Sequence, residues 1–183
     1  NKPFFQDVDK NRLILLDPGV VFGTGSHPTT RDCLAAIELA FSEAAPQTVL
    51  DLGTGTGLLS LAAAKLGSKL TLAVDINSLA AVTANKNVRL NRIKNRILTV
   101  QGKAEDFIDR PADLLIANLH YDVMKHLIST EGFLQKKWFV LSGLLRSQAR
   151  DAAFQLAQKP VRILRHWERN GIWHTFLGKR LLP

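Results

Sequence analysis

The sequence predicts an α/β fold built on a mostly parallel, doubly wound sheet of seven strands. Short apolar runs alternate with helical patterns along most of the 183 residues, which is typical of βαβ units with helices on both faces of a sheet. A glycine-rich turn at residues 51–57 joins one apolar run directly to a helix. Near the end, Asn170 and Gly171 form the Asn-Gly pair that favours a tight hairpin. The sheet should therefore close with an antiparallel C-terminal hairpin.

The elements follow in a regular order. Glycines and two prolines make residues 17–30 neither helix nor strand, and Thr29 or Thr30 is expected to cap the helix that follows. The predicted helices span residues 30–42, 58–66, 78–90, 121–128 and 145–158. The predicted strands span residues 48–51, 70–75, 97–101, 113–117, 138–142, 161–167 and 172–178.

Composition favours a single domain over residues 1–183, since 46% hydrophobic and 22% charged residues are ordinary for a globular chain with a full core. One cysteine, Cys33, excludes internal disulfides and thiolate metal clusters and fits a reducing cytoplasm. No closely spaced His, Asp or Glu set predicts a metal, and no apolar run has the length of a membrane span. Residues 1–5 have no signal-peptide pattern. Because the chain starts without Met, we expect a fragment or a trimmed form of a longer protein.

Three glycines at alternate positions follow an acid in the run Asp-Leu-Gly-Thr-Gly-Thr-Gly, residues 51–57. Glycines permit positive φ there and leave room for a ligand, while the next helix directs unpaired N–H groups into the gap. Dinucleotide folds use the spacing G-x-G-x-x-G instead. The run resembles the cofactor loop of class I S-adenosylmethionine methyltransferases, and the alternative is a plain strand-to-helix turn in another α/β domain. We predict that Asp51, Gly53, Gly55 and Gly57 form part of a cofactor site.

Asp75 ends the next predicted strand, eighteen residues after Gly57. An acid at this strand end can accept both hydroxyls of a ribose. The alternative is a cap for helix 78–90, although Asn77 or Ser78 can cap that helix as well.

Another strand end carries the run Asn-Leu-His-Tyr at residues 118–121. The amide oxygen of Asn118 can accept hydrogen bonds from an amine, and the run resembles the Asn-Pro-Pro-Tyr motif of amino-group methyltransferases. Tyr121 is then expected to lie over the acceptor nitrogen as a cation–π partner. Alternatively, Asn118 only ends the strand and Tyr121 belongs to the core. His120 is either a base or simply an exposed histidine.

The net charge of +8 is concentrated in two basic clusters. The first comprises Lys86, Arg89, Arg92, Lys94 and Arg96. The second, the C-terminal basic tail, comprises Lys159, Arg162, Arg165, Arg169, Lys179 and Arg180. Such clusters contact nucleic acid phosphates or form a solvated face. We favour the solvated face for the first cluster and leave both readings open for the tail.

Residues 17–30 closely resemble the cofactor-covering loop of the PrmA family of ribosomal protein methyltransferases. The match continues through residues 33–34, the glycine loop, the two strand ends and residues 141–145. The resemblance implies a Rossmann-like class I methyltransferase fold, with S-adenosyl-L-methionine as methyl donor and S-adenosyl-L-homocysteine as product. It also implies cofactor contacts, which fall on Thr30, Gly53, Asp75 and Asn118.

The sequence departs from that pattern in three features. The run Leu119-His120-Tyr121 replaces the small apolar residues that are usual in the family after the position of Asn118. Lys103 occupies the place where many class I enzymes have an acid near the adenine amine, so the Ala104 backbone and Glu105 are the expected contacts there. Members of the family also carry an N-terminal domain that captures the substrate, and we expect it to be absent or trimmed here.

The expected function is methylation of amino groups, a lysine or an α-amine, on a ribosomal protein. Asn118 and Tyr121 are the expected catalytic residues. Further expectations are a cytoplasmic location, no membrane contact and an RNA contact through the basic tail. The alternatives are an RNA or small-molecule methyltransferase of the same fold, and a non-catalytic cofactor-binding or interaction domain.

Overall fold

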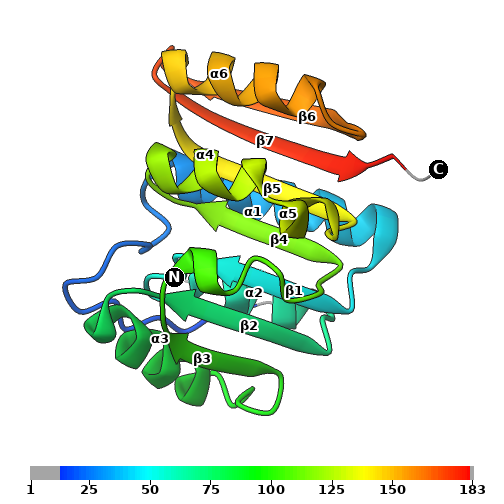
Figure 1. Cartoon of the computed structure of the whole chain (residues 1–183). Coiled ribbons are helices and arrows are strands. Elements are labelled where there is room, and N and C mark those ends of the chain that lie inside the picture. The colour runs from blue at the N-terminus through cyan, green and yellow to red at the C-terminus, as the bar shows by residue number, and fades with distance from the viewer. Residues whose placement is uncertain (1–12, 182–183) are drawn as a thin grey trace, which may run out of the picture.

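A seven-stranded sheet forms the centre of the molecule in the computed structural model, which describes residues 13–181 (Figure 1). The strand order is β3-β2-β1-β4-β5-β7-β6. The first five strands pair in parallel and are β1 (Thr48–Leu52), β2 (Leu70–Asp75), β3 (Ile97–Gln101), β4 (Leu114–Asn118) and β5 (Trp138–Leu145). The residues on which the prediction of no signal peptide rested, 1–5, lie outside the described part.

The C-terminal hairpin consists of β6 (Val161–Arg169) and β7 (Trp173–Arg180). Asn170 and Gly171 both have positive φ, +55° and +65°, as a tight turn between twisted strands requires. The predicted antiparallel hairpin is therefore confirmed. β7 lies between β5 and β6 and is antiparallel to both, so β6 is the edge strand.

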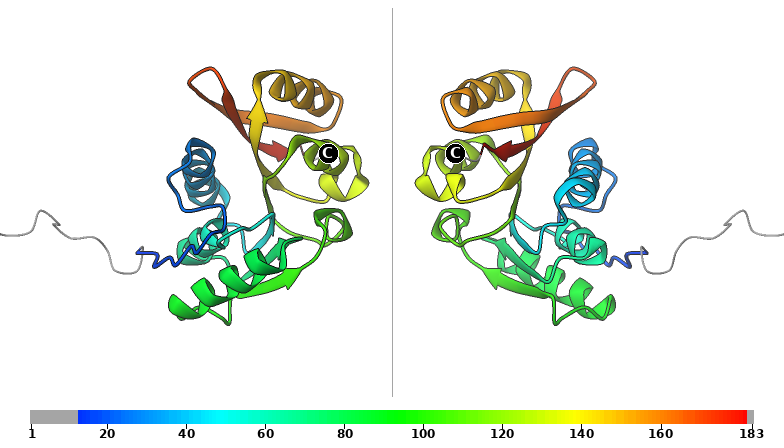
Figure 2. Two further views of the ribbon diagram at one scale, coloured as in Figure 1. Left: turned by 90° about the vertical axis from the view of Figure 1, so that its left-hand side faces the viewer. Right: turned by 90° about the vertical axis from the view of Figure 1, so that its right-hand side faces the viewer.

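Helices cover both faces of the sheet (Figure 2). One layer contains α1 (Pro28–Ala44), α2 (Leu58–Leu66) and α3 (Ser78–Leu90). The other contains α4 (Tyr121–Ser129), α5 (Glu131–Leu134) and α6 (Arg146–Ala157), with the 3₁₀ helix η1 (Ala104–Asp106) near α4. The two layers, together with the hairpin, confirm the predicted doubly wound class. The short elements α5 and η1 were not predicted.

The helix starts reflect local side-chain chemistry. His27 caps α1, because its imidazole Nδ1 accepts the Thr29 backbone N–H and Pro28 fills the first helical position. The expectation that Thr29 or Thr30 caps this helix is therefore wrong. Asn77, one of the two candidates, caps α3 by accepting the Leu79 N–H at 2.9 Å.

The parallel strands direct their carboxyl ends to one edge of the sheet, where ligands bind in such folds. Leu52, at the end of β1, is paired with Val74 of β2 on one side and with Ala117 of β4 on the other. The glycine loop, Asp75 and Asn118 follow directly after these three paired residues. Among the described residues, no helix is both long and apolar enough to cross a membrane.

Candidate functional site

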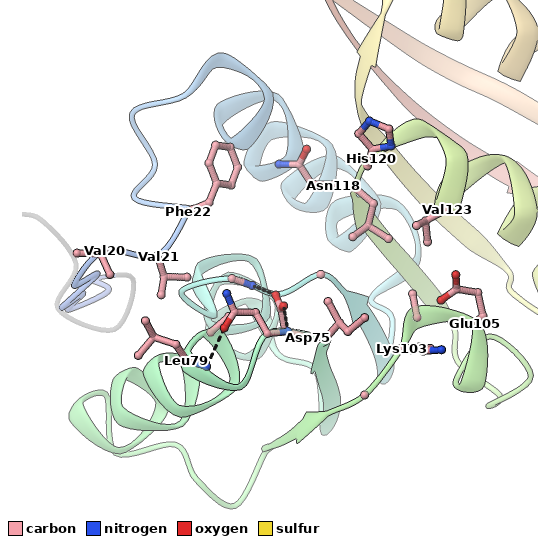
Figure 3. A pocket seen from close by; sticks show the side chains of 18 residues that line it. Val20, Val21, Phe22, Asp75, Leu79, Lys103, Glu105, Asn118, His120 and Val123 are labelled. Carbon is pink, nitrogen blue, oxygen red and sulfur yellow. Dashed lines mark hydrogen bonds between the residues drawn. The ribbon is translucent and has the colours of Figure 1, made fainter.

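A cleft of about 500 Å³ opens at the carboxyl ends of β1, β2 and β4 (Figure 3). Asp75 lies in its middle, Phe22 and its neighbours form one wall, and η1 with Lys103 and Glu105 forms another. The predicted site residues that line it are Gly53, Gly55, Asp75, Ala104, Glu105 and Asn118. Three separate predictions, the glycine loop, the ribose acid and the amide at the end of β4, thus converge on one cavity.

The glycine loop needs its glycines for space as well as for conformation. Gly53 and Gly55 have φ of +74° and +56°. A Cβ on Gly53 would collide with the Leu119 side chain, and one on Gly55 would collide with the Phe22 carbonyl. Gly57 has φ of +83°, but it does not line the cleft, and its Cα instead allows close packing against Ala84 of α3.

The segment at residues 22–23 lies on the glycine loop and is held there by Thr56. The Thr56 backbone N–H donates to the Phe22 carbonyl at 3.0 Å, and its hydroxyl donates to the Gly23 carbonyl at 2.6 Å. Five residues before Phe22, Asp17 forms an ion pair with Lys86 of α3 at 2.6 Å. The structure therefore agrees with a covering role for this segment.

Asp51 lies beneath the glycine loop and not in the cleft. Its side chain is fully buried and accepts the hydroxyls of Thr54 at 2.7 Å and Ser60 at 2.5 Å. Burial raises the pKa of Asp51 to about 6, although both hydroxyl donors oppose this rise. The structure thus gives Asp51 a role in holding the loop, and a direct ligand contact is not part of its geometry.

Asp75 links the glycine loop to the start of α3. One carboxylate oxygen accepts the Gly55 N–H and the other accepts the Asn77 N–H, both at 2.9 Å. Because Asn77 is the cap of α3, Asp75 is not needed for that purpose. An ionised carboxylate has about four acceptor positions, so these two bonds leave capacity for a ligand.

Thr30 provides a polar group that is not satisfied within the protein. It is 1% exposed, and its hydroxyl oxygen has no hydrogen-bond partner among residues 13–181. A small cavity beside the main cleft joins Thr30 to Gly53, Gly55 and Asn118. Leaving a buried hydroxyl unsatisfied costs about 1–3 kcal/mol, so this geometry suits a polar ligand group that reaches Thr30.

Asn118 and His120 lie at the end of the cleft near α4 (Figure 3). The Asn118 Nδ2 is 3.4 Å from the Thr29 hydroxyl oxygen. The His120 side chain is 77% exposed, and its Nδ1 lies 3.5 Å from a carboxylate oxygen of Asp122, whose side chain is 85% exposed. His120 therefore lies in the cleft wall with its side chain open to solvent.

Tyr121 does not reach the cleft. Its hydroxyl donates to the carboxylate of Asp151 and accepts from Gln155 Nε2 at 3.3 Å, so the side chain points to α6. Burial, followed by the hydrogen bond to Asp151, raises the pKa of Tyr121. The predicted cation–π role is corrected here: Tyr121 is the first residue of α4, and its ring packs into the core between α4 and α6.

Apolar residues of the cleft were missed. Phe22, Ile76 and Leu79 line it and are 58%, 65% and 49% exposed. Large apolar side chains that remain exposed around a cavity are typical of ligand sites. The sequence signal that could have revealed these walls was Ile76, an apolar residue that directly follows Asp75 at the end of β2.

Several members of the basic clusters have structural partners. Arg169 binds Asp32 of α1 through Nε and Nη2 at 2.9 and 2.7 Å, and Asp32 is 1% exposed. Arg180 donates to the Leu134 carbonyl at 2.8 Å, and Lys86 pairs with Asp17. Within residues 13–181, no group of three or more His, Cys, Asp or Glu side chains is placed to hold a metal.

Curated relatives of this chain include members of one methyltransferase family. The pattern of the family described as ribosomal protein L11 methyltransferase (PrmA) matches residues 2–181. The ribosomal protein L11 methyltransferase of Alkaliphilus oremlandii is 34% identical over 169 residues, covering 91% of this chain and 53% of the relative. That of Cyanothece sp. is 36% identical over 175 residues, covering 92% and 59%. The chain thus spans about half the length of the curated relatives that it matches.

Solved structures agree with this assignment. The crystal structure of a ribosomal protein L11 methylase from Lactobacillus delbrueckii subsp. bulgaricus superposes with a TM-score of 0.80 and 31% identity, covering 98% of this chain and 91% of that one. A putative RNA methyltransferase from Pyrococcus horikoshii has a TM-score of 0.69 at 17% identity, over 86% and 87% of the two chains, and shows the shared fold alone. From its sequence and its structure, the chain belongs to the ribosomal protein L11 methyltransferase (PrmA) family.

Proposed function

We propose that this chain is an S-adenosylmethionine-dependent methyltransferase domain that methylates amino groups of a ribosomal protein. The observation that carries the proposal is a single cleft that combines the alternate-glycine loop, Asp75 and Asn118, with the unsatisfied Thr30 hydroxyl beside it. The names of the relatives support a ribosomal protein as the substrate. We further propose that the chain acts as one domain, and that a ribosomal substrate places it in the cytoplasm.

The residues of the cleft fit each part of S-adenosylmethionine. Asp75 would accept the ribose hydroxyls with its remaining acceptor positions. Ile76 and Leu79 would cover the faces of the adenine, with the Ala104 backbone and Glu105 near its polar edge. Gly53 leaves space for the amino-acid part, and Thr30 offers it a hydroxyl.

Bound S-adenosylmethionine supplies a methyl group on a sulfonium, so the protein has mainly to position and desolvate the acceptor amine. The Asn118 amide oxygen and the Leu119 carbonyl would accept hydrogen bonds from that amine and thereby direct its lone pair. An ammonium substrate must first lose a proton. His120 lines the cleft and is open to solvent, so it can carry that proton outward.

The test is methyl uptake from labelled S-adenosylmethionine by a ribosomal-protein mixture, ribosomal RNA and small amines, each offered separately. Label on a ribosomal protein, stable to conditions that hydrolyse methyl esters, supports the proposal. Preferential binding of NAD by calorimetry would overturn it. Label confined to RNA would instead support the second enzyme reading.

An RNA contact would use the exposed arginines near the edge strand. Arg162 and Arg165 of β6 and Arg146 and Arg150 of α6 are all exposed. Binding of ribosomal RNA that weakens steeply with salt, and weakens further in Arg162→Gln/Arg165→Gln, is the expected result for such a contact.

A further inference from the structure

A chain of hydrogen bonds runs behind Asn118 from the N-terminus of α1. His27 Nδ1 accepts the Thr29 backbone N–H at 3.3 Å and lies 2.7 Å from the Thr29 hydroxyl oxygen. A ring nitrogen that accepts an N–H carries no proton of its own. The Thr29 hydroxyl must therefore donate to His27.

A hydroxyl has one proton, so Thr29 can only accept from its other neighbour. That neighbour is Asn118, whose amide nitrogen is 3.4 Å away, and Thr29 is 1% exposed, so bulk water has little access to this contact. Asn118 must then present its NH₂ group to Thr29. Its carbonyl oxygen faces the opposite way, toward β5.

Gly143 lies on that opposite side, at a bulge of β5 between Ser142 and Leu144. Its φ is +85°, and a Cβ added to it would lie 3.0 Å from Asn118 Oδ1 and 3.1 Å from the Leu119 carbonyl oxygen. Both oxygens that the proposed function assigns to the amine thus approach a position without a side chain. Any larger residue would displace them by a few tenths of an ångström.

We infer that Thr29, oriented by His27, and Gly143 are positioning residues: they hold the Asn118 carboxamide with its NH₂ group toward Thr29 and its oxygen on the side of Gly143, where the acceptor amine would then lie. The inference rests on the proposed function, in which that oxygen directs the amine lone pair. A reversed carboxamide would present N–H donors to the N–H donors of the amine, and productive orientation would be lost.

Substitutions at Thr29 and His27 test the chain of bonds. Thr29→Val keeps the shape but removes the hydroxyl, and we expect the single-turnover rate at saturating S-adenosylmethionine to fall on the order of 10-fold. The cofactor Kd should stay within about twofold. The single variants Thr29→Ser and His27→Asn should each keep the rate of the unmodified chain. Serine retains the hydroxyl, and an asparagine at the N-cap still accepts both the backbone N–H and the hydroxyl. A Thr29→Val effect that falls on cofactor Kd alone would overturn the inference.

Gly143→Ala tests the other side, with Gly67→Ala as its matched control. Gly67 ends α2 with φ of +119° and has nothing within 4 Å of an added Cβ, so alanine there adds backbone strain without a clash. Both variants should lose stability, whereas only Gly143→Ala should lose single-turnover rate. Equal rates in the two variants would refute the role of Gly143.

A spectroscopic measurement separates this inference from the proposed function. The side-chain NH₂ resonances of Asn118, identified by their absence in Asn118→Ala, should move in Thr29→Val and remain near their original positions in Thr29→Ser. If Thr29→Val leaves them unmoved, the hydrogen bond to Thr29 is wrong even in an active enzyme. If they move but no acceptor is methylated by the unmodified chain, the orientation is upheld and the proposed function fails.

Discussion

Asp75 connects two backbone segments of the cleft while keeping acceptor capacity for a ligand, because each carboxylate oxygen accepts one N–H at 2.9 Å. We expect Asp75→Ala to weaken S-adenosylmethionine binding by about 1.5–3 kcal/mol, the usual value for hydrogen bonds to a charged group. Asp75→Asn, which keeps one acceptor, should lose less. Calorimetry measures both affinities. Unchanged affinity together with lower thermal stability would mean that Asp75 only ties the loop to α3.

Asp51 should affect how the free energy of unfolding depends on pH. Its pKa is about 6 in the folded protein, against an ordinary 3.8, so the folded state holds the proton more tightly. The free energy of unfolding should then decrease as the pH rises from about 4 to about 6. Above about pH 6 this group should cause no further change. Asp51→Asn keeps an acceptor for Thr54 and Ser60 but cannot titrate. Urea unfolding across this range should show the stability of the unmodified chain falling relative to the variant, and parallel curves would contradict the assignment.

The pair α4–α6 explains why the role of Tyr121 was predicted wrongly. A tyrosine soon after a strand-end asparagine has the same sequence pattern whether its ring covers a ligand or a neighbouring helix. Here α4 begins at Tyr121 itself, and the hydroxyl finds Asp151 on α6. The direction of the Tyr121 side chain is determined by packing between α4 and α6, which are far apart in sequence. A local sequence motif carries no information about that packing.

Tyr121→Phe tests this packing role. The substitution keeps the buried ring but removes its hydrogen bonds, so we expect about 1 kcal/mol of lost unfolding free energy. The single-turnover methyl-transfer rate should remain close to that of the unmodified chain. A large fall in rate at unchanged stability would return Tyr121 to the reaction.

Elements with strong patterns were predictable, and those held by distant contacts were not. The strands and long helices follow from apolar runs and periodicity. The four-residue α5 is too short for a periodic pattern. It depends on Thr130, which caps it, and on Lys136, which is 1% exposed and donates to the Gly132 carbonyl at 2.7 Å as well as to the Ile108 carbonyl. Burial of a lysine among carbonyl groups has no local sequence signal.

For the whole molecule, the fold class could be predicted, but not how the hairpin joins the sheet. An Asn-Gly turn shows that β6 and β7 are neighbours, and it does not show which of them pairs with β5. The hairpin is also attached to α1, because Arg169 of β6 binds Asp32 of α1, 137 positions away in sequence. In the site, the cofactor loop and the strand-end polar residues could be predicted from motifs. The apolar walls, and the bonds that orient Asn118, arise only from the folded arrangement.

The ion pair between Asp32 of α1 and Arg169 of β6 gives a prediction about the stability of the fold. Arg169→Ala leaves the carboxylate of Asp32 buried without its cation, and we expect a loss of about 3 kcal/mol in unfolding free energy. The double variant Asp32→Asn/Arg169→Ala should be more stable than Arg169→Ala alone, since it removes the unpaired charge. Urea unfolding of the three variants checks this order. If the double variant is the least stable, the charge is not what makes the single substitution costly.

The position of β7 also constrains how the protein can be made. The last strand of the described chain lies inside the sheet, between β5 and β6. Until Trp173–Arg180 has left the ribosome, β5 presents an unpaired edge and β6 has no strand to join. Open edges of this kind pair readily with other chains, so we expect a chain that lacks β7 to be prone to aggregation until that strand is inserted. All residues that line the ligand cleft, from Val20 to Val123, are synthesised before this strand, so the cleft is complete in sequence while the edge of β5 is still open.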